Sequence, residues 1–198
     1  FDGLTFGAIY GLIAVGYTLV YGVLNLINFA HSEVFIVGAY GVVITLTSLG
    51  FGPSIPNLSL PAIVGDLLLA LLVGMLASAV TAFLLERIAY RPLRKRNAPR
   101  LAFLITAIGA SFAIQSLIFV IRGANAEPAV TMFRPVAVFD VFGTIINNQS
   151  LIIVVAAVVL MILTDMFIRR TRTGRGIRAG AQDPDTATLM GVNKERII

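Results

Sequence analysis

The sequence has no cysteine and one histidine, His31, and only 13% of its residues are charged. The lack of cysteine excludes a disulfide framework and thiolate chemistry, and a single histidine cannot complete a zinc site. An average soluble domain has about 25% charged residues, so this chain has too little charge to coat a soluble globule. Disordered chains are polar and rich in charge, so disorder is excluded as well. The scarcity of charge therefore favours a membrane protein.

Long apolar stretches take the place of the missing charge: 58% of the residues are hydrophobic and the mean hydropathy is +0.92. A transmembrane helix needs about 20 apolar residues to cross roughly 30 Å of hydrocarbon. Enough such stretches are present to predict an all-α polytopic membrane protein with five transmembrane helices. The predicted helices are Leu4–Leu24, Asn28–Leu49, Pro61–Leu85, Leu101–Ile121 and Ser150–Ile168.

The basic residues are concentrated in two stretches. Of the 15 lysines and arginines, six lie within residues 86–100 and seven within residues 169–198. Basic loops between apolar helices mark the cytoplasmic side of a membrane protein. We therefore place both stretches in the cytoplasm and the uncharged loop of residues 50–60 outside. This pattern indicates a membrane orientation, so the pI of about 10.1 does not indicate a nucleic-acid partner.

Two of the predicted helices carry small residues at four-residue intervals. They are Gly3, Gly7 and Gly11 in the first helix and Gly74, Ser78 and Ala82 in the third. Small residues at this spacing let membrane helices approach closely, which predicts ordinary helix packing. A specific dimer face is the alternative. At the end of the fifth helix, Asp165 and Arg169 are four residues apart and can pair at the membrane edge.

A polar cluster separates the first two predicted helices, and its members are Asn25, Asn28, His31 and Glu33. Two interpretations fit this cluster. In the first, Asn28 or Ser32 caps the second helix, and Glu33 in the first turn interacts favourably with the helix dipole. In the second, the side chains lie on or beside a transport path, because polar groups at membrane depth are costly unless they pair or line a cavity. All four residues of the cluster are therefore transport-path candidates.

Residues 169–198 contain a short predicted helix with signals at both ends. Asp183 suits the N-cap and Pro184 the first helical position, while Gly191 suits the left-handed conformation that follows a helix. A helix of about two turns is marginal alone and needs something to dock against. Leu189 and Met190 lie on one face of it, so the helix either docks on a protein or lies on the lipid surface.

The sequence carries no motif of an enzyme active site. The glycine-rich stretch Gly174–Gly180 lacks both the spacing of a phosphate-binding GxxxxGK(S/T) loop and its lysine. Neither an HExxH zinc motif nor a GxSxG nucleophile motif is present. We therefore expect that this chain is not an enzyme and that it holds no metal and no cofactor.

Several ordered motifs extend over nearly the whole chain: Gly7–Gly22, Ile27–Val34, Glu86–Leu93, Ala107–Gly109, Gly174–Ala179 and Leu189–Asn193. Together they resemble the LivH-type permease of bacterial branched-chain amino acid ABC transporters. One departure is Ser32, where that family usually has glycine. The resemblance implies a single transmembrane permease domain over residues 1–198, which is the N-terminal part of a larger bundle, truncated at its C-terminus. About three more spans are expected after Ile198.

The resemblance also implies a function and partners. The expected protein is a multi-pass permease of the bacterial inner membrane that imports branched-chain or other hydrophobic amino acids delivered by a periplasmic or lipid-anchored binding protein. It would pair with a second permease subunit and with ABC ATPase subunits that hold ATP and Mg. In the cytoplasmic coupling segment, residues 169–198, the ATPase-coupling candidates are Arg175, Arg178, Asp183, Pro184, Leu189, Met190 and Gly191. The alternatives are a urea or short-amide permease of the same family, and a stand-alone channel or ion-coupled secondary transporter.

The predicted orientation can be tested with single cysteines at Asn57 and Asn97. Asn57 lies in the uncharged loop, and Asn97 lies among the basic residues of the 86–100 stretch. We expect an impermeant maleimide to label Asn57→Cys in intact cells, and Asn97→Cys only after the cells are permeabilised. Equal labelling of the two variants in intact cells would contradict the orientation.

Overall fold

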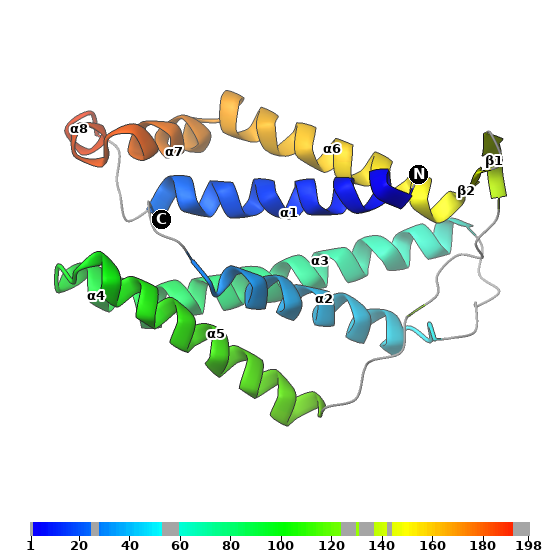
Figure 1. The fold of residues 1–198 in the computed structure, drawn as a ribbon, viewed down its shortest axis with the longest axis horizontal. Helices are drawn as coiled ribbons and strands as arrows, with labels where there is room; N and C mark the ends of the chain where they lie inside the picture. Colours follow the sequence, from blue (N-terminus) through cyan, green and yellow to red (C-terminus); the bar gives the residue numbers. More distant parts are fainter. Residues whose placement is uncertain are drawn as a thin grey trace. The chain divides into compact units, whose positions relative to one another are not determined.

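The computed structural model describes residues 2–24, 28–52, 60–123, 130, 137–141 and 144–191. The chain forms two compact units, one from Phe1–Ile27 and Pro135–Ile198 and the other from Asn28–Arg134. Figure 1 shows that long helices make up most of each unit.

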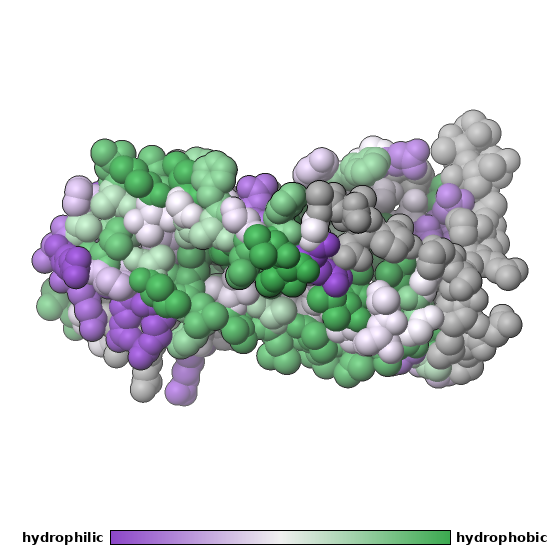
Figure 2. All heavy atoms as spheres, turned by 90° about the horizontal axis from the view of Figure 1, so that it is seen from below, coloured by the Kyte–Doolittle hydropathy of each residue, from purple (hydrophilic) through white to green (hydrophobic). Residues whose placement is uncertain are grey.

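All five predicted membrane helices are present. They are α1 Asp2–Leu24, α2 His31–Ser48, α3 Leu60–Leu85, α5 Arg100–Arg122 and α6 Asn148–Arg170. Each has the length and hydropathy of a membrane span. Large apolar side chains are exposed along them, among them Leu72, Val120 and Ile162, and much of the surface visible in Figure 2 is hydrophobic. The prediction of an all-α, multi-pass membrane fold is therefore confirmed.

In the Asn28–Arg134 unit, α2 and α3 pack closely through glycine. A Cβ atom added to Gly74 of α3 would lie 2.8 Å from the carbonyl oxygen of Gly38 and 2.6 Å from Cγ2 of Val42, both on α2. Ser78, one turn after Gly74, donates a hydrogen bond of 3.1 Å to the carbonyl oxygen of Val34. Small residues allow this approach between membrane helices. The predicted small-residue ridge of α3 is thus a packing surface for α2.

The helix that begins with α3 continues beyond the predicted end of its span. A π-helical turn, η1 Glu86–Tyr90, and the short helix α4 Arg91–Lys95 follow it directly, so the stretch predicted as a cytoplasmic loop is helical up to Lys95. α3 alone has 26 residues, which is about 39 Å and longer than the roughly 30 Å of hydrocarbon. The π-helical turn precedes Pro92, which has no N–H to donate to the turn before it. The cytoplasmic location of this extension stays a prediction.

In the other unit, α1 packs against α6. The Sδ atom of Met161 on α6 lies 3.9 Å from the position that a Cβ atom would take at Gly11. No atom in the described part of the chain lies within 4 Å of the corresponding position at Gly3 or Gly7. Among these residues, the small-residue ridge of α1 therefore makes a packing contact only at its last glycine.

The rest of this unit consists of a hairpin before α6 and two short helices after it. The elements are β1 Ala137–Val141, β2 Thr144–Asn147, α7 Arg172–Gln182 and α8 Pro184–Leu189. The two strands pair antiparallel. They were not predicted, because each is too short to show a recognisable alternation of apolar and polar residues. α7 follows α6 directly and packs on it, with Gly174 buried at the start of α7.

Gly174 leaves no room for a larger residue, which provides a test of the contact between α6 and α7. A Cβ atom there would lie 2.3 Å from the carbonyl oxygen and 2.5 Å from the Cα atom of Ile168. Because both are backbone atoms, we expect Gly174→Ala to lower the free energy of unfolding by about 1–3 kcal/mol, the usual cost of overpacking. The measurement is the melting temperature of the detergent-solubilised protein.

The matched control is Gly180→Ala on the same helix. Nothing lies within 4 Å of the Cβ position at Gly180, and alanine favours a helix more than glycine does. The control should therefore leave the melting temperature unchanged or raise it slightly. Equal losses in the two variants would show that the effect does not come from the contact with Ile168.

Candidate functional site

The turn before α2 is held by Asn28 rather than by a helix cap. Oδ1 of Asn28 accepts hydrogen bonds from the backbone N–H of Ala30, at 3.0 Å, and from the hydroxyl of Tyr90 in η1, at 2.6 Å. Ala30 is the N-cap of α2, and no side chain caps that helix. The prediction that Asn28 or Ser32 caps α2 is therefore wrong. Asn28 stabilises the preceding turn instead, and the Ser32 hydroxyl donates to the carbonyl oxygen of Phe29.

Glu33 is buried in the first turn of α2 and is bonded to α5. It is only 8% exposed. Its Oε1 atom accepts a hydrogen bond of 2.9 Å from the hydroxyl of Ser111 and a longer one, of 3.5 Å, from Ser32. Its Oε2 atom is buried and accepts no hydrogen bond from the described residues. Burying a polar atom without a partner is costly, so Oε2 is less stabilised than Oε1.

Neither cross-helix partner of this cluster was predicted from the sequence. Tyr90 is 62 residues from Asn28, and Ser111 is 78 residues from Glu33. One signal was available for Ser111, because a serine within an apolar span needs a hydrogen-bond partner. Tyr90 lies in one of the motifs that carry the family resemblance, but no local spacing pairs it with Asn28. Such contacts depend on how the helices pack, which the sequence pattern does not specify.

The helix faces that carry Glu33 and Ser111 continue into an apolar cavity. On α2, Val37 and Tyr40 follow Glu33 at the i+4 and i+7 positions, and on α5 Ile114 follows Ser111 at i+3. The cavity has a volume of about 650 Å³ and is bounded by α2, α3, η1 and α5. Its lining surface is almost entirely apolar, and its volume lies within the range of small-molecule sites.

A basic residue lies at the other end of this cavity. The guanidinium carbon of Arg122 is 5.5 Å from the centroid of the Tyr40 ring, a cation–π contact. Arg122 is the last residue of α5, about 16 Å along the helix from Ser111. The cavity therefore has an acidic residue near one end, a basic residue at the other, and apolar walls between them.

The two other transport-path candidates add less to the site. His31 is the first residue of α2 and is partly buried. No group of three metal-ligating side chains occurs in the part of the chain that the structure describes. Asn25 lies outside the described residues. The roles of these side chains in transport stay predictions.

The caps predicted for the short cytoplasmic helix are present in α8. The helix begins at Pro184, as predicted, and Oδ1 of Asp183 accepts a hydrogen bond of 3.2 Å from the backbone N–H of Thr186. Gly191 has a φ of +86°, in the left-handed region, and its N–H donates to a carbonyl oxygen of the last turn at 3.0 Å. α8 has six residues, slightly fewer than the two turns predicted.

The apolar pair at the end of α8 is fully accessible. Leu189 is 88% exposed and Met190 is 81% exposed. Exposure of two large apolar side chains on a capped turn is unfavourable in water, and such pairs usually mark a contact surface. The described residues of this chain do not cover the pair.

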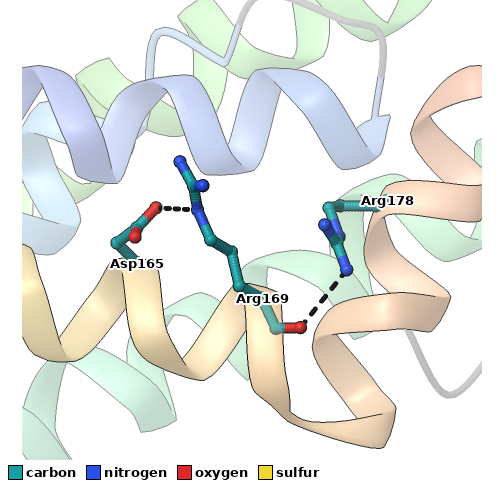
Figure 3. A network of polar contacts seen from close by, with 3 residues as sticks. All are labelled: Asp165, Arg169 and Arg178. Carbon is teal, nitrogen blue, oxygen red and sulfur yellow. Dashed lines mark hydrogen bonds and ion pairs between the residues drawn. The ribbon is translucent and has the colours of Figure 1, made fainter.

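Arginines at the junction of α6 and α7 form a small polar network, drawn in Figure 3. Nε of Arg169 donates a hydrogen bond of 2.7 Å to Oδ1 of Asp165, which confirms the pair predicted at this spacing. Nη2 of Arg178, on α7, donates a bond of 3.3 Å to the carbonyl oxygen of Arg169. That carbonyl lies in the last turn of α6, where no helical donor is available. Arg178 therefore joins α7 to α6, while Arg175 is exposed on α7.

Tyr90→Phe tests the contact with Asn28, because it removes only the hydroxyl. The stacking of the Tyr90 ring on Phe103, with 6.4 Å between centroids, is retained. Loss of one buried hydrogen bond should lower the free energy of unfolding by about 1 kcal/mol, which is measured as a lower melting temperature of the solubilised protein. In an Asn28→Ala background the same change should cost much less, since the bond is already lost. Fully additive losses would contradict the contact.

The whole chain, residues 1–198, matches the protein family described as branched-chain amino acid transport system / permease component. It is 35% identical over 200 residues to BraD of Pseudomonas aeruginosa, and 35% identical over 205 residues to LivH of Escherichia coli strain K12. Both relatives are high-affinity branched-chain amino acid transport system permease proteins. It is also 30% identical over 191 residues to a probable branched-chain amino acid transport permease protein LivH of Methanocaldococcus jannaschii.

The matched regions cover different shares of the chain and of its relatives. They include all of this chain for BraD and the E. coli LivH, and 93% of it for the M. jannaschii protein. They include 62%, 63% and 55% of those relatives, respectively, so the chain spans less than two thirds of their length. No solved structure matches the chain. From the match over all 198 residues and the five apolar helices, we conclude that the chain belongs to the permease family of branched-chain amino acid transport systems.

Proposed function

We propose that this chain acts in the permease subunit of an ATP-driven importer of branched-chain amino acids in the bacterial inner membrane. The names of the relatives support the substrate class and the transport role. The five apolar helices support a path through the membrane rather than a peripheral role. The proposed partners are a second permease subunit, an external binding protein that delivers the amino acid, and ATPase subunits.

The observation that carries this proposal is the exposed apolar pair on α8. Leu189 is the last residue of α8 and Met190 directly follows it; the helix has a cap at each end and belongs to the segment predicted to lie in the cytoplasm. Burial of two such side chains contributes roughly 3–6 kcal/mol before the costs of association. A short amphipathic helix that enters an apolar groove is a common mode of subunit recognition. In this proposal α8 is the coupling helix, and the groove belongs to the ATPase subunit.

The mechanism we propose is a two-state alternation of access. ATP and Mg are held by the ATPase subunits, and closure of the ATPase pair displaces α8 and tilts the spans. The polar cluster at the start of α2, including His31 and Glu33, lies on or beside the path that opens. Polar side chains at membrane depth are costly, so their presence there favours a function.

Replacing the apolar pair on α8 with charge tests the coupling role. We expect the double variant Leu189→Asp/Met190→Asp to lose the ATPase from the purified complex, or to uncouple ATP hydrolysis from leucine uptake. The physical reason is that an apolar groove does not accept two carboxylates without a large desolvation cost. The measurements are pull-down of the ATPase with the detergent-solubilised full-length permease, and leucine uptake into proteoliposomes.

The matched control exchanges the two residues, Leu189→Met/Met190→Leu. It keeps an apolar pair of similar volume, a change that packed surfaces usually tolerate. The control should bind the ATPase and support uptake. Normal binding and uptake by the Asp variant would mean that α8 is not the coupling element, and a helix lying on lipid would then replace it.

A further inference from the structure

Glu33 is a carboxylate in a membrane span, and no basic residue that the structure describes forms an ion pair with it. In the part of the chain that the structure describes, the ion pairs are Arg94 with Glu86 and Arg169 with Asp165, and Glu33 forms none. Its hydrogen-bond donors are the neutral hydroxyls of Ser111 and Ser32, both at Oε1. Buried charges in proteins are normally paired. An intramembrane carboxylate that lacks such a partner usually binds a substrate or an ion. The lack of a hydrogen bond at the remaining oxygen, Oε2, therefore indicates a cationic ligand.

The position of Glu33 beside the apolar cavity indicates the polarity of the rest of that ligand. One turn beyond Glu33, Val37 lines the apolar cavity, and one turn beyond Ser111, so does Ile114. The hydrogen bond between Glu33 and Ser111 joins α2 to α5, and neither residue lines the cavity itself, so the carboxylate lies about one helical turn from the lining residues Val37 and Ile114. The part of the ligand that lies in the cavity must be apolar, because the cavity walls are apolar. The cavity volume of about 650 Å³ is ample for a short aliphatic chain.

We propose that Glu33 and Ser111 form a binding site for the primary ammonium group of an aliphatic amino acid, whose side chain lies in the cavity between α2, α3 and α5. Oε2 would accept a hydrogen bond from the ammonium group. Oε2 is covered in this conformation, so binding requires the Glu33 side chain to rotate toward the cavity, which its three rotatable bonds permit. The site rests on the proposed function, since it takes the amino acid as the transported compound.

A lipid acyl chain or an apolar helix could also fill the cavity. Either would satisfy the aliphatic walls but would leave Oε2 without a donor, because neither carries a cation at that depth. The ammonium ligand accounts for both the walls and the carboxylate. The other occupants are distinguished from it by whether binding depends on an amino group.

The test uses a single cysteine in the cavity wall, which is possible because the chain has no native cysteine. Ile114→Cys is placed in the full-length permease, assembled with its partner subunits in nanodiscs, and its rate of reaction with N-ethylmaleimide is measured. The probes are leucine, 3-methylbutylamine, which lacks the carboxylate, and 4-methylpentanoate, which lacks the amino group. We expect leucine and the amine to slow the labelling and the acid to leave it unchanged.

Glu33→Gln supplies the decisive comparison, because it keeps the shape and the hydrogen bond from Ser111 but removes the charge. It should raise the leucine concentration needed for protection by about tenfold or more, the loss expected for one charge-assisted hydrogen bond. Glu33→Asp keeps the charge and should retain more protection than Glu33→Gln. Each variant is first checked for a single assembled peak by gel filtration. Lys95→Cys at the end of α4, outside the cavity lining, is the control whose labelling the probes should not change.

ATP-dependent leucine uptake by the wild-type complex is measured in parallel, so that two failures can be separated. Absence of that uptake would overturn the proposed function. If uptake is present, protection by all three probes alike would identify an apolar pocket without an ammonium site and would overturn the inference. The absence of protection by leucine, or equal protection in the wild type and Glu33→Gln, would overturn it as well.

Discussion

The close approach of α2 and α3 at Gly38 and Gly74 is the constraint on which the Asn28–Arg134 unit depends. A Cβ atom at Gly38 would lie 3.3 Å from the carbonyl oxygen of Gly74 and 2.1 Å from the hydroxyl oxygen of Ser78. In lipid no hydrophobic effect draws helices together, so the size of the residues between them decides how near they lie. A larger residue would move α2 away from α3 and break the bond of 3.1 Å between Ser78 and Val34.

The polar contacts at the start of α2 follow from this approach. Once α2 lies against α3, the turn that precedes it meets η1, and Asn28 accepts the hydroxyl of Tyr90 at 2.6 Å. The next helix, α5, is joined to α2 through Ser111 and Glu33 at 2.9 Å. Buried polar groups need partners within the protein, so each such pair restricts the helix arrangement. The apolar cavity occupies the space that these contacts leave between the three helices.

Sequence analysis succeeded where the signal is local or averaged over many residues. The five spans were predicted because a run of about 20 apolar residues is unambiguous, and the caps Asp183 and Gly191 because each acts within its own turn. It failed for the helical stretch after α3, where basic residues suggested a loop although they extend a helix, and for the two short strands before α6. It found Glu33 but not Ser111, since that pairing is created by packing between distant segments. Only the structure shows that Oε1 of Glu33 accepts hydrogen bonds and that Oε2 accepts none from the described residues.

The corner between α6 and α7 governs how a displacement of α8 would reach the membrane helices. Oγ1 of Thr171 accepts a hydrogen bond of 2.9 Å from the N–H of Gly174, so the first turn of α7 is fixed to the single residue that joins it to α6. Arg178 binds a carbonyl oxygen in the last turn of α6, and Gly174 lies too close to the α6 backbone to allow a shift. Only Asp183 separates α7 from α8, and it caps α8. The corner between α6 and α7 therefore has little freedom to bend, so a displacement of α7 would be passed on to the end of α6.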